Sequence, residues 1–156
     1  MPLVFLLLSA CGGAPPPSAP APVPAWHWID LAPDQGSLEV QLATHCARAR
    51  EAGQVPIAEL TATWCAPCLA LRRSLTDPRM QRALMGAYVL SLDVDLWGNA
   101  LYDAGLSANG VPTLFALAPD DCSPTGATIN GGAWGEDVPA QMAPVLQRFV
   151  EEARGG

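Results

Sequence analysis

The segment AELTATWCAPCLALRRSL, residues 58–75, decides how this sequence is interpreted. It places two residues between Cys65 and Cys68, the second of which is Pro67, and Trp64 directly before the pair. An apolar run of strand length precedes the pair, and the residues after it predict a helix. Such a pair of cysteines can bind a metal, form a structural disulfide or carry out redox chemistry.

The first two uses fit this chain poorly. A structural zinc site usually needs four ligands, often from two Cys-x-x-Cys pairs, and this sequence has one such pair. The other candidate ligands, Cys46, Cys122, His27 and His45, are scattered without ligand spacing. A disulfide across so short a loop removes little entropy from the unfolded chain, so it has little structural value. We therefore predict no metal site.

Redox chemistry fits the position of the pair between a buried strand and a helix N-terminus. Backbone N–H groups and the helix dipole favour an anion there, which lowers the pKa of the first thiol. Cys65 is therefore the predicted nucleophile. Cys68, about one turn further on and expected to be more buried, would resolve a mixed disulfide. A Cys-x-x-Cys motif beside a βαβ pattern is typical of this chemistry.

The sequence ATWCAPC, residues 62–68, resembles the thioredoxin active site, whose usual form is Trp-Cys-Gly-Pro-Cys. The sequence GVPT, residues 110–113, matches a second signature of that family, a cis-proline that faces the cysteines. An ordinary strand entry is the alternative interpretation of this Val-Pro. The resemblance implies that the backbone beside this proline pairs with an extended substrate. It implies substrate contacts from five residues: Trp64, Ala66, Pro67, Val111 and Pro112.

Glu59 provides a third match, because the thioredoxin family has a buried acid, usually Asp, six residues before the first cysteine. A buried carboxyl group should have a raised pKa. The resemblance implies that Glu59 accepts the Cys68 proton during resolution, directly or through water. The alternative is a glutamate at an edge of the sheet or facing solvent.

The rest of the chain alternates strands and helices. Strands are predicted at 26–31, 55–62, 87–95, 112–117 and 127–131, and helices at 37–53, 66–75, from 77 onward, 98–106 and 137–153. A turn rich in Pro, Asp and Gly is predicted at 118–126. This order indicates an α/β domain, residues 26–156, with a mixed central β-sheet flanked by helices on both faces. The resemblance, which spans residues 26–154, implies the thioredoxin fold.

The N-terminus has the features of an export signal. Residues 1–10 form a short apolar run that predicts a signal peptide. Leu8-Ser9-Ala10-Cys11 resembles the bacterial lipobox, which implies lipidation of Cys11. Residues 11–25 are rich in Pro and Ala and predict an extended linker. A simple signal peptide, or a disordered terminus without an anchor, is the alternative.

Two cysteines lie outside the motif and the N-terminus. Cys46 lies on the apolar face of the first predicted helix, so a buried, inert thiol is the first expectation. Cys122 lies in the predicted turn, where an exposed free thiol would be a liability in an oxidising compartment. A Cys46–Cys122 disulfide, at the end of the sheet away from the motif, is the alternative.

The 156 residues carry a net charge of −7, which argues against sequence-independent nucleic-acid binding. The acidic, short chain favours a monomer. We predict an exported thiol-disulfide oxidoreductase, a lipoprotein facing the periplasm, that needs no cofactor beyond its cysteines. The segment from Cys68 to the strand at 87–95 resembles periplasmic thioredoxin-like domains, such as the C-terminal domain of the Dsb-system transmembrane reductase.

Ala66-Pro67 is similar to the Gly-Pro of reducing relatives, whereas strongly oxidising relatives carry a His there. This favours a reductant of disulfides in exported proteins, supplied by an upstream membrane electron donor. A disulfide oxidase or isomerase, and a lipid-anchored binding module that does no turnover, are the alternatives.

Overall fold

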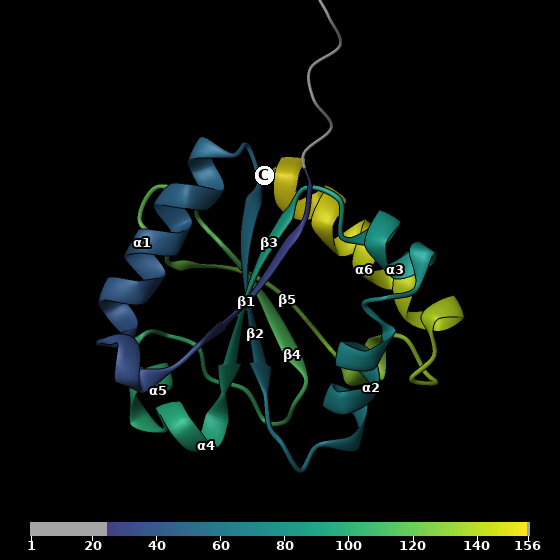
Figure 1. Ribbon diagram of the computed structural model, residues 1–156, viewed down its shortest axis with the longest axis horizontal. Helices are drawn as coiled ribbons and strands as arrows, with labels where there is room; N and C mark the ends of the chain where they lie inside the picture. Colours follow the sequence, from purple (N-terminus) through teal and green to yellow (C-terminus); the bar gives the residue numbers. More distant parts are fainter. Residues whose placement is uncertain (1–24, 156) are drawn as a thin grey trace, which may run out of the picture.

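A computed structural model of the protein describes residues 25–155 (Figure 1). The predicted signal peptide, the predicted lipidation site Cys11 and the linker up to residue 24 lie outside the described residues. Among the residues that the structure describes, no helix is both long and apolar enough to cross a membrane.

A five-stranded mixed sheet forms the centre of the domain, in the order β1-β3-β2-β4-β5. Strands β1, β3 and β2 are parallel, β4 is antiparallel to β2, and β5 is antiparallel to β4. The strands are β1 (His27–Leu31), β2 (Val55–Thr61), β3 (Ala87–Asp93), β4 (Thr113–Leu117) and β5 (Pro124–Asn130). The central strands β2, β3 and β4 are buried almost throughout, which explains their continuous apolar sequences.

Helices cover both faces of the sheet, as the sequence predicts (Figure 1). On one face lie α1 (Leu38–Glu51), α4 (Val94–Trp97) and α5 (Asn99–Asp103). On the other lie α2 (Ala66–Ser74), α3 (Pro78–Ala83) and α6 (Pro139–Gly155). Each face has its own apolar core. The described residues also contain two short 3-10 turns, Pro33–Gln35 and Gly131–Ala133.

The helix boundaries follow from capping residues. Ser37 accepts a hydrogen bond from the Val40 backbone N–H and begins α1, and Gly53, with φ of 65°, follows its end. Asp77 caps α3 in the same way, directly before Pro78. These boundaries confirm the predicted starts of both helices.

Two strand boundaries differ from the prediction by more than one residue. The strand predicted at 87–95 ends at Asp93, because the Asp93 carboxylate accepts the Asp95 and Leu96 backbone N–H groups and begins α4. The strand predicted at 127–131 begins earlier, at Pro124. The turn is shorter than the one predicted at 118–126 from its Pro, Asp and Gly content. Cys122 has φ of 62° in this turn, and the chain returns to pair with β4 earlier than predicted.

Candidate redox site

Cys65 and Cys68 lie at the N-terminus of α2, directly after β2. Cys65 is the N-cap residue, and its Sγ lies 3.2 Å from the Cys68 backbone nitrogen, which donates to it. The two sulfurs form a disulfide, with the Cα atoms 5.2 Å apart. The predicted position of Cys65 at the positive end of a helix is therefore confirmed. Any negative charge that develops on its sulfur is met by an N–H group and the helix dipole.

The two cysteines hardly differ in exposure. Cys65 is 4% exposed and Cys68 is 2% exposed in the disulfide form. Burial therefore does not decide which sulfur attacks a substrate. The assignment of Cys65 as the nucleophile rests on its capping position instead, because the helix terminus stabilises a thiolate at Cys65.

The Val111-Pro112 peptide bond is cis, as the resemblance implies. The carbonyl oxygen of Val111 lies 3.5 Å from Cys65 Sγ, so this loop is in contact with the disulfide. Gly131 holds the loop from the other side by donating its N–H to the Pro112 carbonyl over 3.0 Å. A Cβ on Gly131 would lie 3.2 Å from Pro112 Cδ, so the close approach favours glycine.

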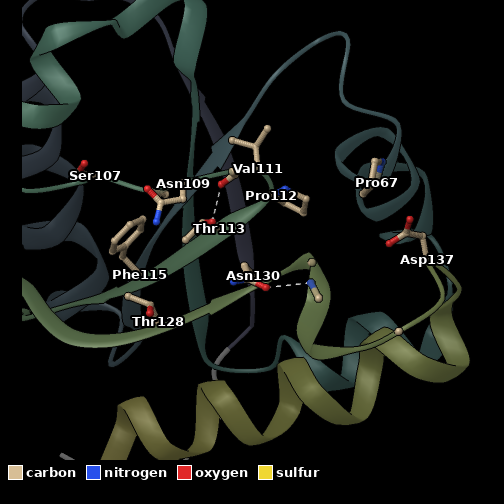
Figure 2. A pocket seen from close by; sticks show the side chains of 15 residues that line it. Pro67, Ser107, Asn109, Val111, Pro112, Thr113, Phe115, Thr128, Asn130 and Asp137 are labelled. Atoms are coloured by element: carbon tan, nitrogen blue, oxygen red, sulfur yellow. Dashed lines mark hydrogen bonds between the residues drawn. The ribbon is translucent and has the colours of Figure 1, made fainter.

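A groove of about 600 Å³ extends from this loop along the outer strands (Figure 2). Pro67 and Pro112 lie at its end beside the disulfide, and Phe115 and Thr128 of the paired strands β4 and β5 line it further on. Asp137 is the charged residue that lines it. The groove provides space for an extended chain that approaches Cys65 past Pro112.

Trp64 and Ala66 are exposed beside the disulfide. The Trp64 ring is 67% exposed, and its Nε1 donates to Asp95 Oδ2 over 2.7 Å, which fixes the ring against α4. Ala66 begins α2 and is also exposed. The residues predicted to contact a substrate thus surround the disulfide at one end of the sheet.

Glu59 is buried, with 2% of its surface exposed. The alternative of a glutamate at an edge or in solvent is therefore wrong. Its Oε2 accepts a hydrogen bond of 2.6 Å from the Ser91 hydroxyl, and the two residues are paired in register on β2 and β3. Burial raises the pKa of Glu59 to about 7, although the Ser91 hydroxyl, Arg72 and Thr61 oppose this rise. A carboxyl group with this pKa can accept and release a proton near neutral pH.

Sequence reasoning missed Ser91, Asp95 and the Arg72–Asp30 ion pair that lies near Glu59. A single serine within the apolar run YVLSL, residues 88–92, is the signal that was available for Ser91. Its partner depends on the register between β2 and β3, which the sequence does not reveal.

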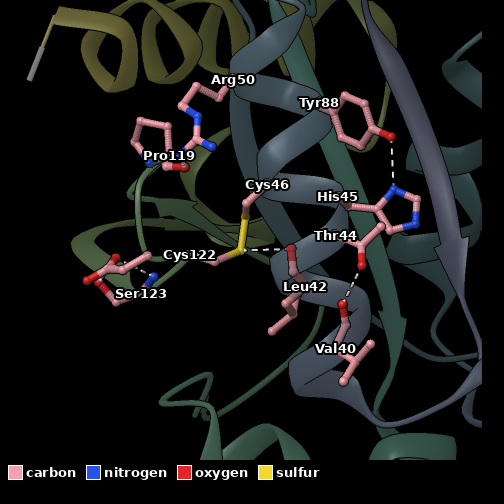
Figure 3. The surroundings of a disulfide bond; sticks show 11 residues. Val40, Leu42, Thr44, His45, Cys46, Arg50, Tyr88, Pro119, Cys122 and Ser123 are labelled. Carbon is pink, nitrogen blue, oxygen red and sulfur yellow. Dashed lines mark hydrogen bonds between the residues drawn. A yellow bond between two sulfur atoms is a disulfide. The ribbon is translucent and has the colours of Figure 1, made fainter.

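Cys46 and Cys122 form a second disulfide, with Cα atoms 5.8 Å apart (Figure 3). The first expectation for Cys46, an inert free thiol, is therefore wrong. The bond joins the middle of α1 to the turn between β4 and β5, and Arg50 of α1 contacts Pro119 of the same turn. Among residues 25–155, no group of three or more His, Cys, Asp or Glu side chains is arranged to hold a metal ion.

Comparison with solved structures identifies the fold. The chain is similar to a disulphide isomerase from Xylella fastidiosa, with a TM-score of 0.54, 18% identity, and coverage of 72% of this chain and 88% of that chain. It is similar to thioredoxin f from spinach chloroplast, with a TM-score of 0.51 and 18% identity. That match covers 86% of this chain and 97% of the spinach chain.

The chain is also similar to thioredoxin from Trichomonas vaginalis, with a TM-score of 0.50 and 23% identity. That match covers 78% of this chain and 96% of the Trichomonas chain. No protein-family model and no curated protein matches the chain. At these identities the likeness shows the architecture, and the chain has the thioredoxin fold.

Proposed function

We propose that the protein is a thiol-disulfide oxidoreductase that reduces disulfides of exported proteins. The observation that carries the proposal is the Cys65–Cys68 disulfide at the N-terminus of α2, in contact with the cis Val111-Pro112 loop. The helix terminus favours a thiolate at Cys65, and the groove beside Pro112 leaves room for a polypeptide substrate.

The reaction proceeds in two steps. The Cys65 thiolate attacks one sulfur of a substrate disulfide, the substrate S–S bond breaks, and the other substrate sulfur leaves with the electron pair. Cys68 then loses its proton to Glu59 and attacks Cys65 Sγ, which releases the second substrate sulfur. Two electrons pass to the substrate, and Cys65 and Cys68 end as the disulfide.

The residues between the cysteines support the proposed direction of electron flow. Ala66-Pro67 resembles the reducing Gly-Pro type, which favours a reductant. A reductant outside the cytosol requires an electron donor, and a donor in the membrane suits a protein anchored there through a lipid on Cys11. The apolar residues 1–10 and the Pro-rich linker support this location.

A redox titration tests the direction. The full-length chain carrying Cys11→Ser is equilibrated in dithiol buffers, and Cys65 and Cys68 are quantified by alkylation and mass. A midpoint near about −270 mV supports the reductant. A midpoint of about −120 to −180 mV would reverse the assignment to an oxidase or isomerase.

Substrate trapping tests the activity itself. In a Cys68→Ser variant the resolving step is lost, so mixed disulfides between Cys65 and exported proteins should accumulate. The double variant Cys65→Ser/Cys68→Ser is the matched control and should trap nothing. A Cys68→Ser variant that traps no exported protein would leave a non-catalytic binding module as the better account.

A further inference from the structure

Three polar side chains form a row across β1, β3 and β2, on the face that α2 covers. Asp30 of β1 is paired in register with Ser91 of β3, and Ser91 is paired with Glu59 of β2. Residues paired across a sheet project to the same face. On this face Ile57 and Val89, two positions earlier on β2 and β3, are completely buried. The row is therefore the polar end of an otherwise apolar surface.

Cys68 and Arg72 are four residues apart on α2 and therefore lie on one side of that helix. Arg72 forms an ion pair with Asp30, and Arg72, Asp30, Cys68 and Ser91 together line a surface pocket of about 290 Å³. Glu59 is not among the described residues that line this pocket. The Ser91 hydroxyl thus lines the pocket that Cys68 also lines, and it donates to the buried carboxylate of Glu59 over 2.6 Å.

We propose that Ser91 relays the proton of the Cys68 thiol to Glu59 through this pocket. The proposal rests on the proposed oxidoreductase function and adds the route of its second proton transfer. Glu59 is enclosed in the sheet, and the Ser91 side chain connects its carboxylate to the pocket. This connection requires a side chain that both accepts and donates hydrogen bonds. Serine has this property, whereas an apolar residue at the same register position would isolate the carboxylate.

The proton and electron balance of the resolving step is complete. The S–H bond of Cys68 breaks, its proton passes by way of pocket water to Ser91 Oγ, and Ser91 gives its own proton to Glu59 Oε2. The Cys68 thiolate attacks Cys65 Sγ, and the substrate sulfur leaves with the electron pair of the broken bond. The substrate disulfide is the oxidant, so no further reactant is needed.

The groups that face Glu59 from other elements set the pH range of the relay. Arg72 of α2, together with the Ser91 and Thr61 hydroxyls, favours the carboxylate, whereas burial and Asp30 of β1 favour the acid. The carboxyl group must be ionised to receive a proton. The second step should therefore accelerate as the pH rises through about 7 and then reach a plateau.

Single-turnover kinetics with Ellman's reagent test the relay, because each step releases one coloured thiolate. The full-length Cys11→Ser chain is reduced at the site only, with the Cys46–Cys122 bond verified by mass. The first release reports attack by Cys65 and the second reports resolution by Cys68. In Ser91→Ala the first release should be unchanged, and the plateau rate of the second should fall roughly 10-fold or more.

Two variants make the result specific. Ser91→Thr keeps a hydroxyl and should restore the plateau rate of the second release. Thr61→Val removes the other hydroxyl near Glu59 that lines the pocket, and it should leave that plateau rate unchanged. Thermal unfolding of each variant confirms that it is folded.

Two results would overturn the relay. In the first, Ser91→Ala moves the pH midpoint of the second release upward but leaves its plateau rate intact, which means that Ser91 only stabilises the Glu59 carboxylate. In the second, Thr61→Val slows the second release and Ser91→Ala does not. Failure of the oxidoreductase function itself is distinguishable, because it is measured by the trapping of exported proteins in Cys68→Ser, whereas Ellman's reagent reacts with any accessible thiol and reports the two steps whether or not exported proteins are substrates.

Discussion

The two disulfides of this domain differ in almost every property. Cys65 and Cys68 are three residues apart and lie between a strand and the helix that follows it. Cys46 and Cys122 are 76 residues apart and join the middle of a helix to a turn at the other end of β4 (Figure 3). The first bond constrains the unfolded chain little and the second constrains it strongly.

Exposure alone would select Cys46 and Cys122, and not the pair to which we assign the proposed redox chemistry. Cys122 is partly exposed and lines a surface pocket of about 520 Å³, whereas Cys65 is 4% exposed. The surroundings of the sulfurs favour Cys65 instead. Cys65 caps a helix N-terminus, whereas Cys46 lies within α1, where the backbone N–H groups are used by the helix. Under the proposed function, the stabilisation of a thiolate therefore identifies the reactive pair better than accessibility does.

The largest expected effect separates the two pairs by activity. Cys65→Ser should reduce the dithiothreitol-driven reduction of insulin to the uncatalysed background, because no other thiol in the domain caps a helix. Cys122→Ser, a matched replacement at the more exposed cysteine, should retain most of the activity. Turnover by both variants, measured side by side, decides this. A large loss of activity in Cys122→Ser in a protein that remains folded would contradict the division of roles.

The next effect separates the pairs by stability. The double variant Cys46→Ala/Cys122→Ala should lose about 4 kcal/mol of unfolding free energy, because its bond closes a long loop. The variant Cys65→Ala/Cys68→Ala should lose about 2 kcal/mol or less, because its loop is short. Urea unfolding under non-reducing conditions measures both. Equal losses of unfolding free energy in the two double variants would show that the two disulfides do not differ in their contribution to stability.

The next prediction concerns how the unfolding free energy depends on pH. The buried carboxyl group of Glu59, on the face of the sheet that α2 covers, should cause this dependence. Burial raises the pKa of Glu59 from 4.5 to about 7, so the folded protein holds a proton that the unfolded chain releases between these values. The unfolding free energy should therefore fall as the pH rises from about 4.5 to about 7, by roughly 3 kcal/mol, and then level off. Glu59→Gln should lack this contribution.

Urea unfolding of the parent and Glu59→Gln proteins at a series of pH values checks this sign. A difference between the two proteins that stays constant across the window would show that Glu59 ionises normally. When the Cys46–Cys122 bond is removed from both the parent and Glu59→Gln proteins, the difference in their unfolding free energies should depend on pH in the same way. The reason is that this bond lies in the other core.

The smallest expected effect concerns the support of Pro112. In Gly131→Ala the new Cβ would lie 3.2 Å from Pro112 Cδ, so the proline must move by a few tenths of an ångström. Attack by Cys65 on a peptide disulfide should slow by roughly 3-fold to 10-fold. Gly110→Ala is the control on the same loop, because a Cβ there meets nothing within 4 Å. Equal rates in the two variants would show that this contact does not position the loop.

Much of this architecture could be predicted from the sequence. The strand before Cys65, the start of a helix at the cysteine pair and the alternation of strands and helices depend on local patterns, and the structure confirms them. The cis peptide at Pro112 followed from the resemblance of GVPT to a known signature. These features are encoded within a few neighbouring residues, which is why sequence reasoning reaches them.

Long-range pairings could not be predicted in the same way. The contact between Glu59 and Ser91 depends on strand register, and the Cys46–Cys122 bond depends on where the turn after β4 lies relative to α1. Asp93 shows the same limit at short range, since its carboxylate ends a strand that the apolar pattern extends to residue 95. The first two depend on geometry that forms only when distant segments pack, whereas the third depends on a local cap that competes with the apolar pattern.

The most direct test of the central claim is a redox titration of the full-length Cys11→Ser chain in which all four remaining cysteines are followed separately by alkylation and mass. We predict that Cys65 and Cys68 become reduced together at a midpoint near about −270 mV. Cys46 and Cys122 should remain bonded until the potential falls below about −300 mV. Reduction of Cys46 and Cys122 at a higher potential than Cys65 and Cys68 would contradict the account.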